Sequence, residues 1–123
     1  MKIFVTGAAG FIASNLTDRL LRDGHEVTGY DNFSTGQEGF LQDALRSDRF
    51  RLHRRDLLEP GALAEAMAGA DLVMHLAANA DVRFGTQHPT KDLEQNTIAT
   101  SHVLEAMRAT GVKRIAFAST GSV

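Results

Sequence analysis

The sequence contains no cysteine, which excludes a disulfide scaffold, a thiolate metal site and a cysteine nucleophile. This absence is compatible with the reducing cytoplasm, where we expect the protein to be. No apolar run approaches the ~18 residues of a membrane span, so no membrane partner is expected. A faintly signal-like start, Met1 to Val5, is cut short by Thr6 and Gly7. The chain also lacks a basic excess: 13 basic against 15 acidic side chains give a net charge of -2, which argues against a nucleic-acid partner.

Several signatures of catalytic and metal sites are missing as well. No Gly-Lys-Ser/Thr follows the glycine segment near the start, which excludes a phosphate-binding loop of the ATPase kind. No G-x-S-x-G elbow indicates a serine hydrolase. The histidines show no metal-type H-x-x-x-H spacing, so no metal site is expected. They are His25, His53, His75, His88 and His102. His75 ends an apolar run, where a hydrogen-bonded core histidine is the simplest interpretation.

The sequence itself predicts one globular domain over residues 1–123, because 43% of the residues are hydrophobic and 23% charged. Strand-like and helix-like blocks alternate, and three of the helix-like blocks end at Gly24, Gly69 and Gly111. Repeated strand–helix–strand units predict a parallel α/β sheet with helices on both faces, a doubly wound, Rossmann-like fold with strand order 3-2-1-4-5. The predicted strands are 3–5, 27–30, 50–53, 72–76 and 115–118. The predicted helices are 11–22, 40–45, one with Pro60 in its first turn that ends at Gly69, and one from Pro89 to Gly111.

Small or acidic residues follow each predicted strand, at the sheet edge where such folds bind ligands. After the first strand, Gly7 and Gly10 permit a tight turn and close approach of a pyrophosphate. The helix that follows directs the N–H groups at Phe11 and Ile12 toward that anion. Ala13 stands where the usual glycine spacing has a third glycine. An ordinary strand-to-helix turn is the alternative.

Two carboxylates further along indicate the adenosine side of a dinucleotide. Asp31 lies about 20 residues after the glycines, where a carboxylate accepts ribose hydroxyls and repels a 2′-phosphate, so NAD is favoured over NADP. A turn-forming Asp-Asn pair is the alternative. Asp56 can accept from the adenine amino group with Leu57 against the ring, or it can be a salt-bridged surface carboxylate. The basic stretch 49–55 is better explained by an alternating strand than by a nucleic-acid patch.

Five segments in order resemble the extended short-chain dehydrogenase/reductases of the nucleotide-sugar epimerase/dehydratase branch. They are Thr6-Gly7-Ala8-Ala9-Gly10-Phe11-Ile12, Asp31-Asn32-Phe33-Ser34-Thr35-Gly36, His75-Leu76-Ala77-Ala78-Asn79-Ala80-Asp81-Val82-Arg83, Asn96, and Ala118-Ser119-Thr120-Gly121-Ser122-Val123. The resemblance covers only the N-terminal part of such an enzyme. Ala13 and Asn79 depart from its pattern.

The resemblance also implies roles for residues. It implies that Val82 and Arg83 lie near a nucleotide sugar and that the Thr120 hydroxyl binds the reacting oxygen as a catalytic group. The implied NAD contacts are Gly7, Gly10, Phe11, Ile12, Asp31, Asn32, Ser34, Thr35, Gly36, Asp56, Leu57, Leu76, Ala77, Ala78 and Asn96.

The family's activity implies hydride transfer from a sugar hydroxyl carbon to NAD⁺, with a tyrosine near a lysine as the base. The only tyrosine here is Tyr30, on a predicted strand beside the adenosine site. We therefore expect this chain to be the NAD-binding part of an enzyme resembling UDP-glucose 4-epimerase, inactive alone, within an intact homodimer. The strand 115–118 would become an unprotected edge, so self-association, C-terminal disorder or a missing remainder is expected. A non-catalytic NAD(P)-binding sensor of the same fold is the alternative.

Overall fold

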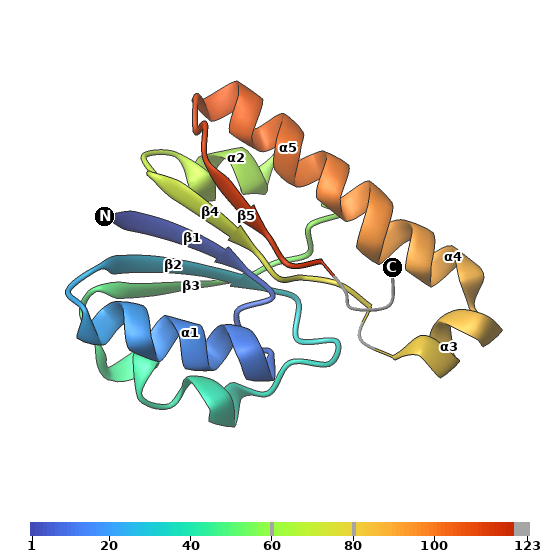
Figure 1. Cartoon of the computed structure of the whole chain (residues 1–123), viewed down its shortest axis with the longest axis horizontal. Coiled ribbons are helices and arrows are strands. Elements are labelled where there is room, and N and C mark those ends of the chain that lie inside the picture. Colours follow the sequence, from blue (N-terminus) through green and yellow to red (C-terminus); the bar gives the residue numbers. More distant parts are fainter. Residues whose placement is uncertain (60, 80, 120–123) are drawn as a thin grey trace.

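The structure is a computed structural model that describes residues 1–59, 61–79 and 81–119. It contains a five-stranded parallel sheet with the order β3-β2-β1-β4-β5 (Figure 1). This order confirms the predicted doubly wound fold. The strands are β1 (Lys2–Thr6), β2 (Glu26–Asp31), β3 (Phe50–Arg54), β4 (Leu72–His75) and β5 (Ile115–Phe117).

Helices cover both faces of this sheet. Helix α1 (Phe11–Arg22) packs on one face, and α2 (Ala62–Met67) and α5 (Ala99–Thr110) pack on the other (Figure 1). Alternation along the strands separates two apolar cores, since successive side chains point to opposite faces. In β1, Phe4 belongs to the core under α2 and α5, whereas Ile3 and Val5 belong to the core under α1.

Glycines end the helices as expected. Gly24, Gly69 and Gly111 have φ values of 90°, 86° and 77°, in the left-handed region that residues with a Cβ rarely adopt. Each therefore reverses the chain so that the next strand can begin.

The apolar residues Ile12, Leu16 and Leu20 have helical spacing and predict one buried face of α1, but the helix buries another. Ile12 is 69% exposed, and the buried residues include the smaller Ala13, Ser14 and Thr17. Small side chains on this face let the helix lie close to the sheet. Gly29 on β2 lies instead against the glycine turn, where an added Cβ would lie 2.8 Å from the Cβ of Ala8.

One of the predicted helices is wrong in detail, and another is placed only in part. In place of a helix over 40–45, the chain forms two 3₁₀ turns, η1 (Glu38–Leu41) and η2 (Ala44–Arg46). Leu41 and Ala44, three residues apart, are both buried. The residue Pro60 lies outside the described residues, and α2 begins at Ala62.

The long helix predicted from Pro89 to Gly111 has three parts. It consists of α4 (Pro89–Asp92), a π-helical turn η3 (Leu93–Ile98) and α5. The π turn has no apolar periodicity that would predict it. A separate short helix, α3 (Val82–Gln87), precedes these parts and was not expected.

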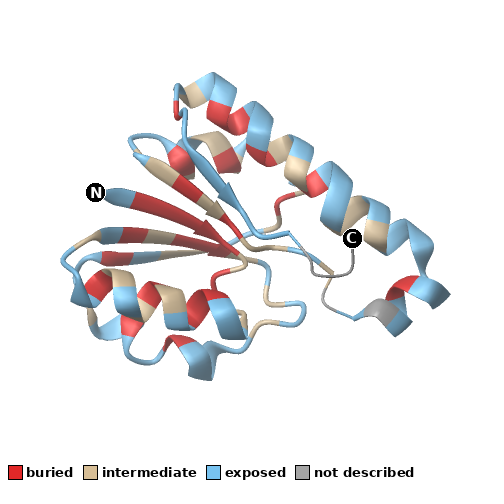
Figure 2. Cartoon of the chain, viewed as in Figure 1, coloured by how far each residue is buried: buried red, intermediate tan, exposed pale blue. Residues whose placement is uncertain are grey.

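Strand β5 lies at the edge of the sheet and is exposed along its length (Figure 2). The side chain of Phe117 is 58% exposed. This position agrees with the expected edge strand, and self-association through it stays a prediction. Within the described parts of the chain, no helix is long and apolar enough to cross a membrane.

Candidate dinucleotide-binding cleft

A cleft of about 130 Å³ opens at the carboxyl ends of the parallel strands. It gathers segments that are far apart in sequence: the glycine turn after β1, the loop after β2, the loop after β3 and the end of β4. The residues of the predicted cofactor site that line it are Gly7, Gly10, Asp31, Asn32, Ser34, Thr35, Gly36, Asp56, Leu57, Leu76, Ala77 and Ala78.

The glycine turn is packed against the end of β4. Gly7 has a φ of 68°, and a Cβ added there would lie 2.9 Å from both N and Cα of Ala77. The Gly7 N–H donates to the Tyr30 carbonyl at 2.9 Å, and the Gly10 N–H donates to the Gly7 carbonyl at 2.9 Å. Glycine at position 7 is therefore required both by the backbone conformation and by the neighbouring strand.

The N-terminus of α1 carries no cap of its own. Gly10 is the N-cap residue and supplies no side-chain acceptor, and the first turn has no acidic residue. The first intrahelical donor is the Ser14 N–H, which binds the Gly10 carbonyl at 2.9 Å. The N–H groups at Phe11 and Ile12 thus lie at a positive helix end, an arrangement that fits a pyrophosphate.

Asp31 joins the glycine turn to the loop after β2. Its Oδ2 accepts from the Ala9 N–H at 2.8 Å, and its Oδ1 accepts from the Phe33 N–H at 2.7 Å. Gly36 lies against the same pair, since an added Cβ there would lie 2.6 Å from the Ala9 Cβ and 3.1 Å from Asp31 Oδ1. Each carboxylate oxygen can accept a second hydrogen bond, so the Asp31 carboxylate can still receive two ribose hydroxyls.

Asp56 shapes the third wall of the cleft. Its Oδ1 accepts from the Leu58 N–H at 2.9 Å, and its Oδ2 lies 3.4 Å from the Asn32 amide nitrogen. Leu57 is 6% exposed, and its carbonyl accepts from His102 Nδ1 of α5 at 2.7 Å. The contact from His102 was not expected, because it joins residues 45 positions apart.

Some predicted residues lie elsewhere. Asn96 lies in η3 and its Oδ1 accepts from the Asn79 N–H at 2.8 Å, whereas the neighbouring Gln95 lines the cleft. The N–H of Arg83, near the start of α3, donates to Asp81 Oδ1 at 2.9 Å.

The remaining predicted substrate residues can be placed only in part. Val82 is the first residue of α3, and Thr120 lies outside the described residues. Arg55 also lines the cleft and was not predicted there. Its place next to Asp56 was the only available signal.

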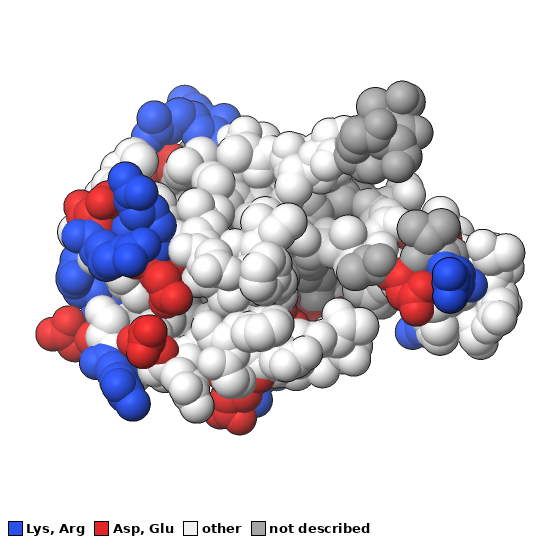
Figure 3. Space-filling view, turned by 60° about the horizontal axis from the view of Figure 1, so that its bottom comes forward, with Lys and Arg blue, Asp and Glu red and all other residues white. Residues whose placement is uncertain are grey.

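The basic stretch on β3 is partly neutralised by ion pairs. Arg54 Nη2 lies 2.6 Å from Glu38 Oε1, and Arg55 Nη1 lies 3.7 Å from Glu59 Oε2. Figure 3 shows the same mixing on one face of the molecule, where Lys and Arg lie near Asp and Glu at the left end and again at the right end, with uncharged surface between the two groups. These pairings favour a solvated strand over a nucleic-acid surface.

A larger hollow of about 550 Å³ lies along β2, β3 and α2. Lys2, Glu26, Thr28, Arg51 and Glu65 are among its lining residues. It lacks the glycine turn and the N-terminus of α1. The smaller cleft is therefore the better candidate, because it unites strand ends, glycines and an uncapped helix end.

Comparison with known proteins agrees with this geometry. Residues 3–123 match the model of the NAD dependent epimerase/dehydratase family. The chain belongs to the NAD-dependent epimerase/dehydratase family. It is 40% identical to the UDP-glucose 4-epimerase of Mycolicibacterium smegmatis, over 98% of this chain and 39% of that protein. It is 38% identical to UDP-glucuronic acid decarboxylase 1 of Danio rerio, over 99% of this chain and 28% of that protein.

Among solved structures, the chain is similar to the Thermus thermophilus UDP-glucose 4-epimerase in complex with NAD. The identity is 35% and the TM-score 0.88, covering 98% of this chain and 38% of that one. The expected family and its cofactor, NAD, are thus confirmed. The chain spans about two fifths or less of the length of these relatives.

Proposed function

We propose that this member of the epimerase/dehydratase family binds NAD in the cleft at the carboxyl ends of β1, β2 and β3. It would be the cofactor-binding part of an enzyme that acts on a nucleotide sugar and resembles UDP-glucose 4-epimerase. The observation that carries the proposal is the convergence of the uncapped α1 N-terminus, Gly7 and Asp31 on one cleft. Relatives named as UDP-glucose 4-epimerases and UDP-glucuronic acid decarboxylases support the nucleotide sugar as substrate.

The residues of the cleft have separate tasks. Gly7 and Gly10 let the backbone approach the pyrophosphate, and the N–H groups at Phe11 and Ile12 donate to it. Asp31 receives ribose hydroxyls and holds its place through the Ala9 N–H. The loop 32–36, Asp56, Leu57 and the segment 76–78 enclose the rest of the dinucleotide. Asn96 contributes from η3 through the Asn79 N–H that its side chain accepts, whereas Gln95 lines the cleft. When bound, NAD⁺ supplies the hydride acceptor for oxidation of a sugar hydroxyl.

The sugar-side roles follow the family resemblance alone. Val82 and Arg83 would contact the sugar, and the Thr120 hydroxyl would hold the reacting oxygen. The sole tyrosine, Tyr30, is 1% exposed within the core, where it cannot reach a sugar as the base. We therefore propose that these 123 residues bind NAD without turning over a sugar. The intact enzyme would be a cytoplasmic homodimer.

The test is calorimetry of the chain with NAD and with NADP, followed by an assay with UDP-glucose or UDP-galactose. We expect NAD to bind more tightly than NADP, since the Asp31 carboxylate repels a 2′-phosphate. Absence of NAD binding would refute the proposal, and tighter NADP binding would refute the role of Asp31. Turnover of either sugar by these 123 residues would refute the proposal that they are inactive by themselves.

The alternative is a non-catalytic NAD(P)-binding sensor. A tyrosine and lysine four positions apart in the coding sequence that follows, at the family's position, would exclude the sensor.

A further inference from the structure

His75, the last residue of β4, is buried between two threonine hydroxyls. It is 1% exposed, as expected for a hydrogen-bonded core histidine. Its Nδ1 lies 2.7 Å from Thr6 Oγ1 on β1, and its Nε2 lies 2.8 Å from Thr100 Oγ1 on α5. The ring therefore connects the strand before the glycine turn with the helix that follows η3.

The hydroxyl of Thr6 determines the state of Nδ1. Thr6 Oγ1 accepts from the Leu76 N–H and from the Ala77 N–H, each at 3.1 Å. A hydroxyl has one hydrogen and two acceptor positions, so both of its acceptor positions are used. Its hydrogen must point to His75, and Nδ1 is therefore an unprotonated acceptor.

The hydroxyl of Thr100 determines the state of Nε2 in the same way. Thr100 Oγ1 donates its hydrogen to the Asn96 carbonyl at 2.6 Å. It can then only accept from His75, so Nε2 carries the proton. The two threonines together select one neutral tautomer of His75.

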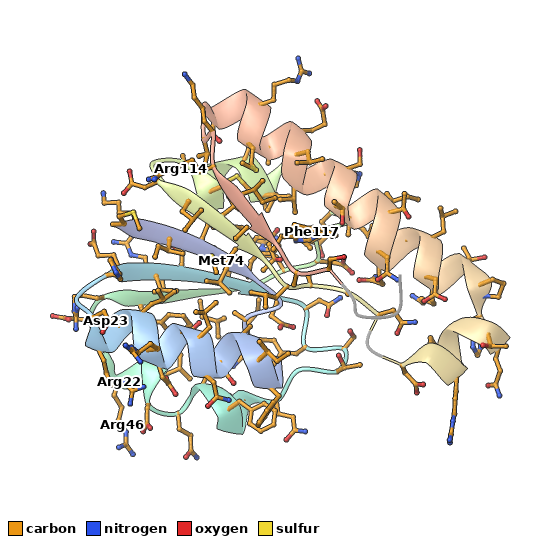
Figure 4. The ribbon with its side chains drawn as sticks, viewed as in Figure 1. Arg22, Asp23, Arg46, Met74, Arg114 and Phe117 are labelled. Carbon is orange, nitrogen blue, oxygen red and sulfur yellow. The ribbon has the colours of Figure 1, made fainter. Side chains whose placement is uncertain are left out.

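A second proton on His75 is disfavoured by its surroundings. Nδ1–H would oppose the Thr6 hydroxyl, which could accept it only by releasing the Leu76 or Ala77 amide. Burial alone lowers the pKa of His75. Among the described residues, the side chains that hydrogen-bond to the ring or stack on it are uncharged: Thr6, Thr100, and Phe117 of β5, whose ring centroid lies 5.7 Å from that of His75. Phe117 is labelled in Figure 4.

The network reaches several walls of the cleft. Leu76 and Ala77, held through Thr6, both line it. At the other end, Asn96 accepts the Thr100 hydroxyl with its carbonyl and the Asn79 N–H with its side chain. The same π turn places Gln95 in the cleft, and π turns occur frequently at functional sites.

We propose that His75 is a positioning residue for the dinucleotide cleft. As the neutral Nε2–H tautomer, it holds the end of β4 against the glycine turn through Thr6, and it connects these two segments to η3 through Thr100. This inference rests on the proposed function, because it assigns the network to the NAD site. His75 acts through Thr6 and Thr100, and its positioning role does not require contact with the cofactor.

The first readout is the tautomer of His75 in the ¹⁵N-labelled full chain, from two-bond ¹⁵N–¹H correlation spectra assigned through its own backbone resonances. We expect Nδ1 to show the shift of an unprotonated ring nitrogen and Nε2 that of a protonated one. An Nδ1–H tautomer or an imidazolium at pH 7 would overturn the proposal. This readout needs no substitution, so it remains decisive even if a variant fails to fold.

The second readout is the Kd for NAD of three variants. Thr100→Val removes the acceptor for Nε2–H, Thr100→Ser keeps it, and Thr110→Val is the matched control. Thr110 lies on the same helix and its Oγ1 likewise donates to a carbonyl of its own helix, that of Ala106 at 2.7 Å.

We expect Thr100→Val to weaken NAD binding about five- to tenfold, as for loss of one hydrogen bond, and the other two variants to bind like wild type. Equal affinities of Thr100→Val and Thr110→Val would overturn the positioning role. Wild-type chain that does not bind NAD would instead refute the proposed function itself.

Discussion

Gly7 is a residue of the cleft at which a single methyl group should strongly affect folding, because both its backbone conformation and its surroundings oppose a Cβ. In Gly7→Ala, a φ of 68° places a residue with a Cβ in the left-handed region, which costs about 1–2 kcal/mol. The new Cβ would also lie 2.9 Å from backbone atoms of Ala77, and the end of β4 cannot rotate away as a side chain could. Overpacking of this kind adds about 1–3 kcal/mol, so we expect a loss of about 2–5 kcal/mol in the free energy of unfolding.

The matched control is Gly111→Ala. Gly111 has a φ of 77°, and an added Cβ there meets no described atom within 4 Å. Only the backbone cost of about 1–2 kcal/mol applies to it. Urea unfolding followed by circular dichroism should place the midpoint of Gly7→Ala about 1 M below that of Gly111→Ala, for a typical dependence on urea. Equal midpoints would refute the claim that the end of β4 is packed against the glycine turn.

Other substitutions and a change of pH test separate parts of the structure. Asp31→Asn removes the charge that repels a 2′-phosphate, so the NAD-to-NADP affinity ratio by calorimetry should fall about tenfold, and an unchanged ratio would contradict this role. Tyr30→Phe removes a buried hydroxyl that has no hydrogen-bond partner among the described residues, so thermal unfolding should show unchanged or higher stability. A loss above about 1 kcal/mol would show that the Tyr30 hydroxyl has a hydrogen-bond partner after all. Because burial lowers the pKa of His75 below its ordinary value of 6.5, the unfolded chain takes up a proton at this residue before the folded chain does. The free energy of unfolding should therefore decline as the pH falls below 6.5, which urea midpoints from pH 7.5 to 5 should show.

Much of the fold is predictable because its signals are local. Glycines at 24, 69 and 111 end helices, and short apolar runs after them form strands, so the strand order follows from the rules of right-handed crossovers. The cleft is predictable for the same reason. Parallel strands bring their carboxyl ends to one edge, and therefore Gly7, Asp31 and Asp56 must come close together.

The errors occur where burial depends on a distant element. The apolar spacing of α1 predicts Ile12 on the buried face, yet Ala13 and Thr17 take that place because the helix lies close to the sheet. The π turn η3 shifts which side chains of this helix face the cleft, and no periodicity in the sequence predicts that shift. Gln95 therefore lines the cleft, where Asn96 was expected.

The sequence alone thus determined the parallel α/β fold, the family and the strand ends that form the cleft, since each depends on residues close in the chain. Only the tertiary structure decided how that cleft is held. The partners of His75 are 69 and 25 positions away, and its tautomer depends on what else their hydroxyls bind. A hydrogen-bond network joins groups by direction and distance in space, and residue types along the chain carry neither.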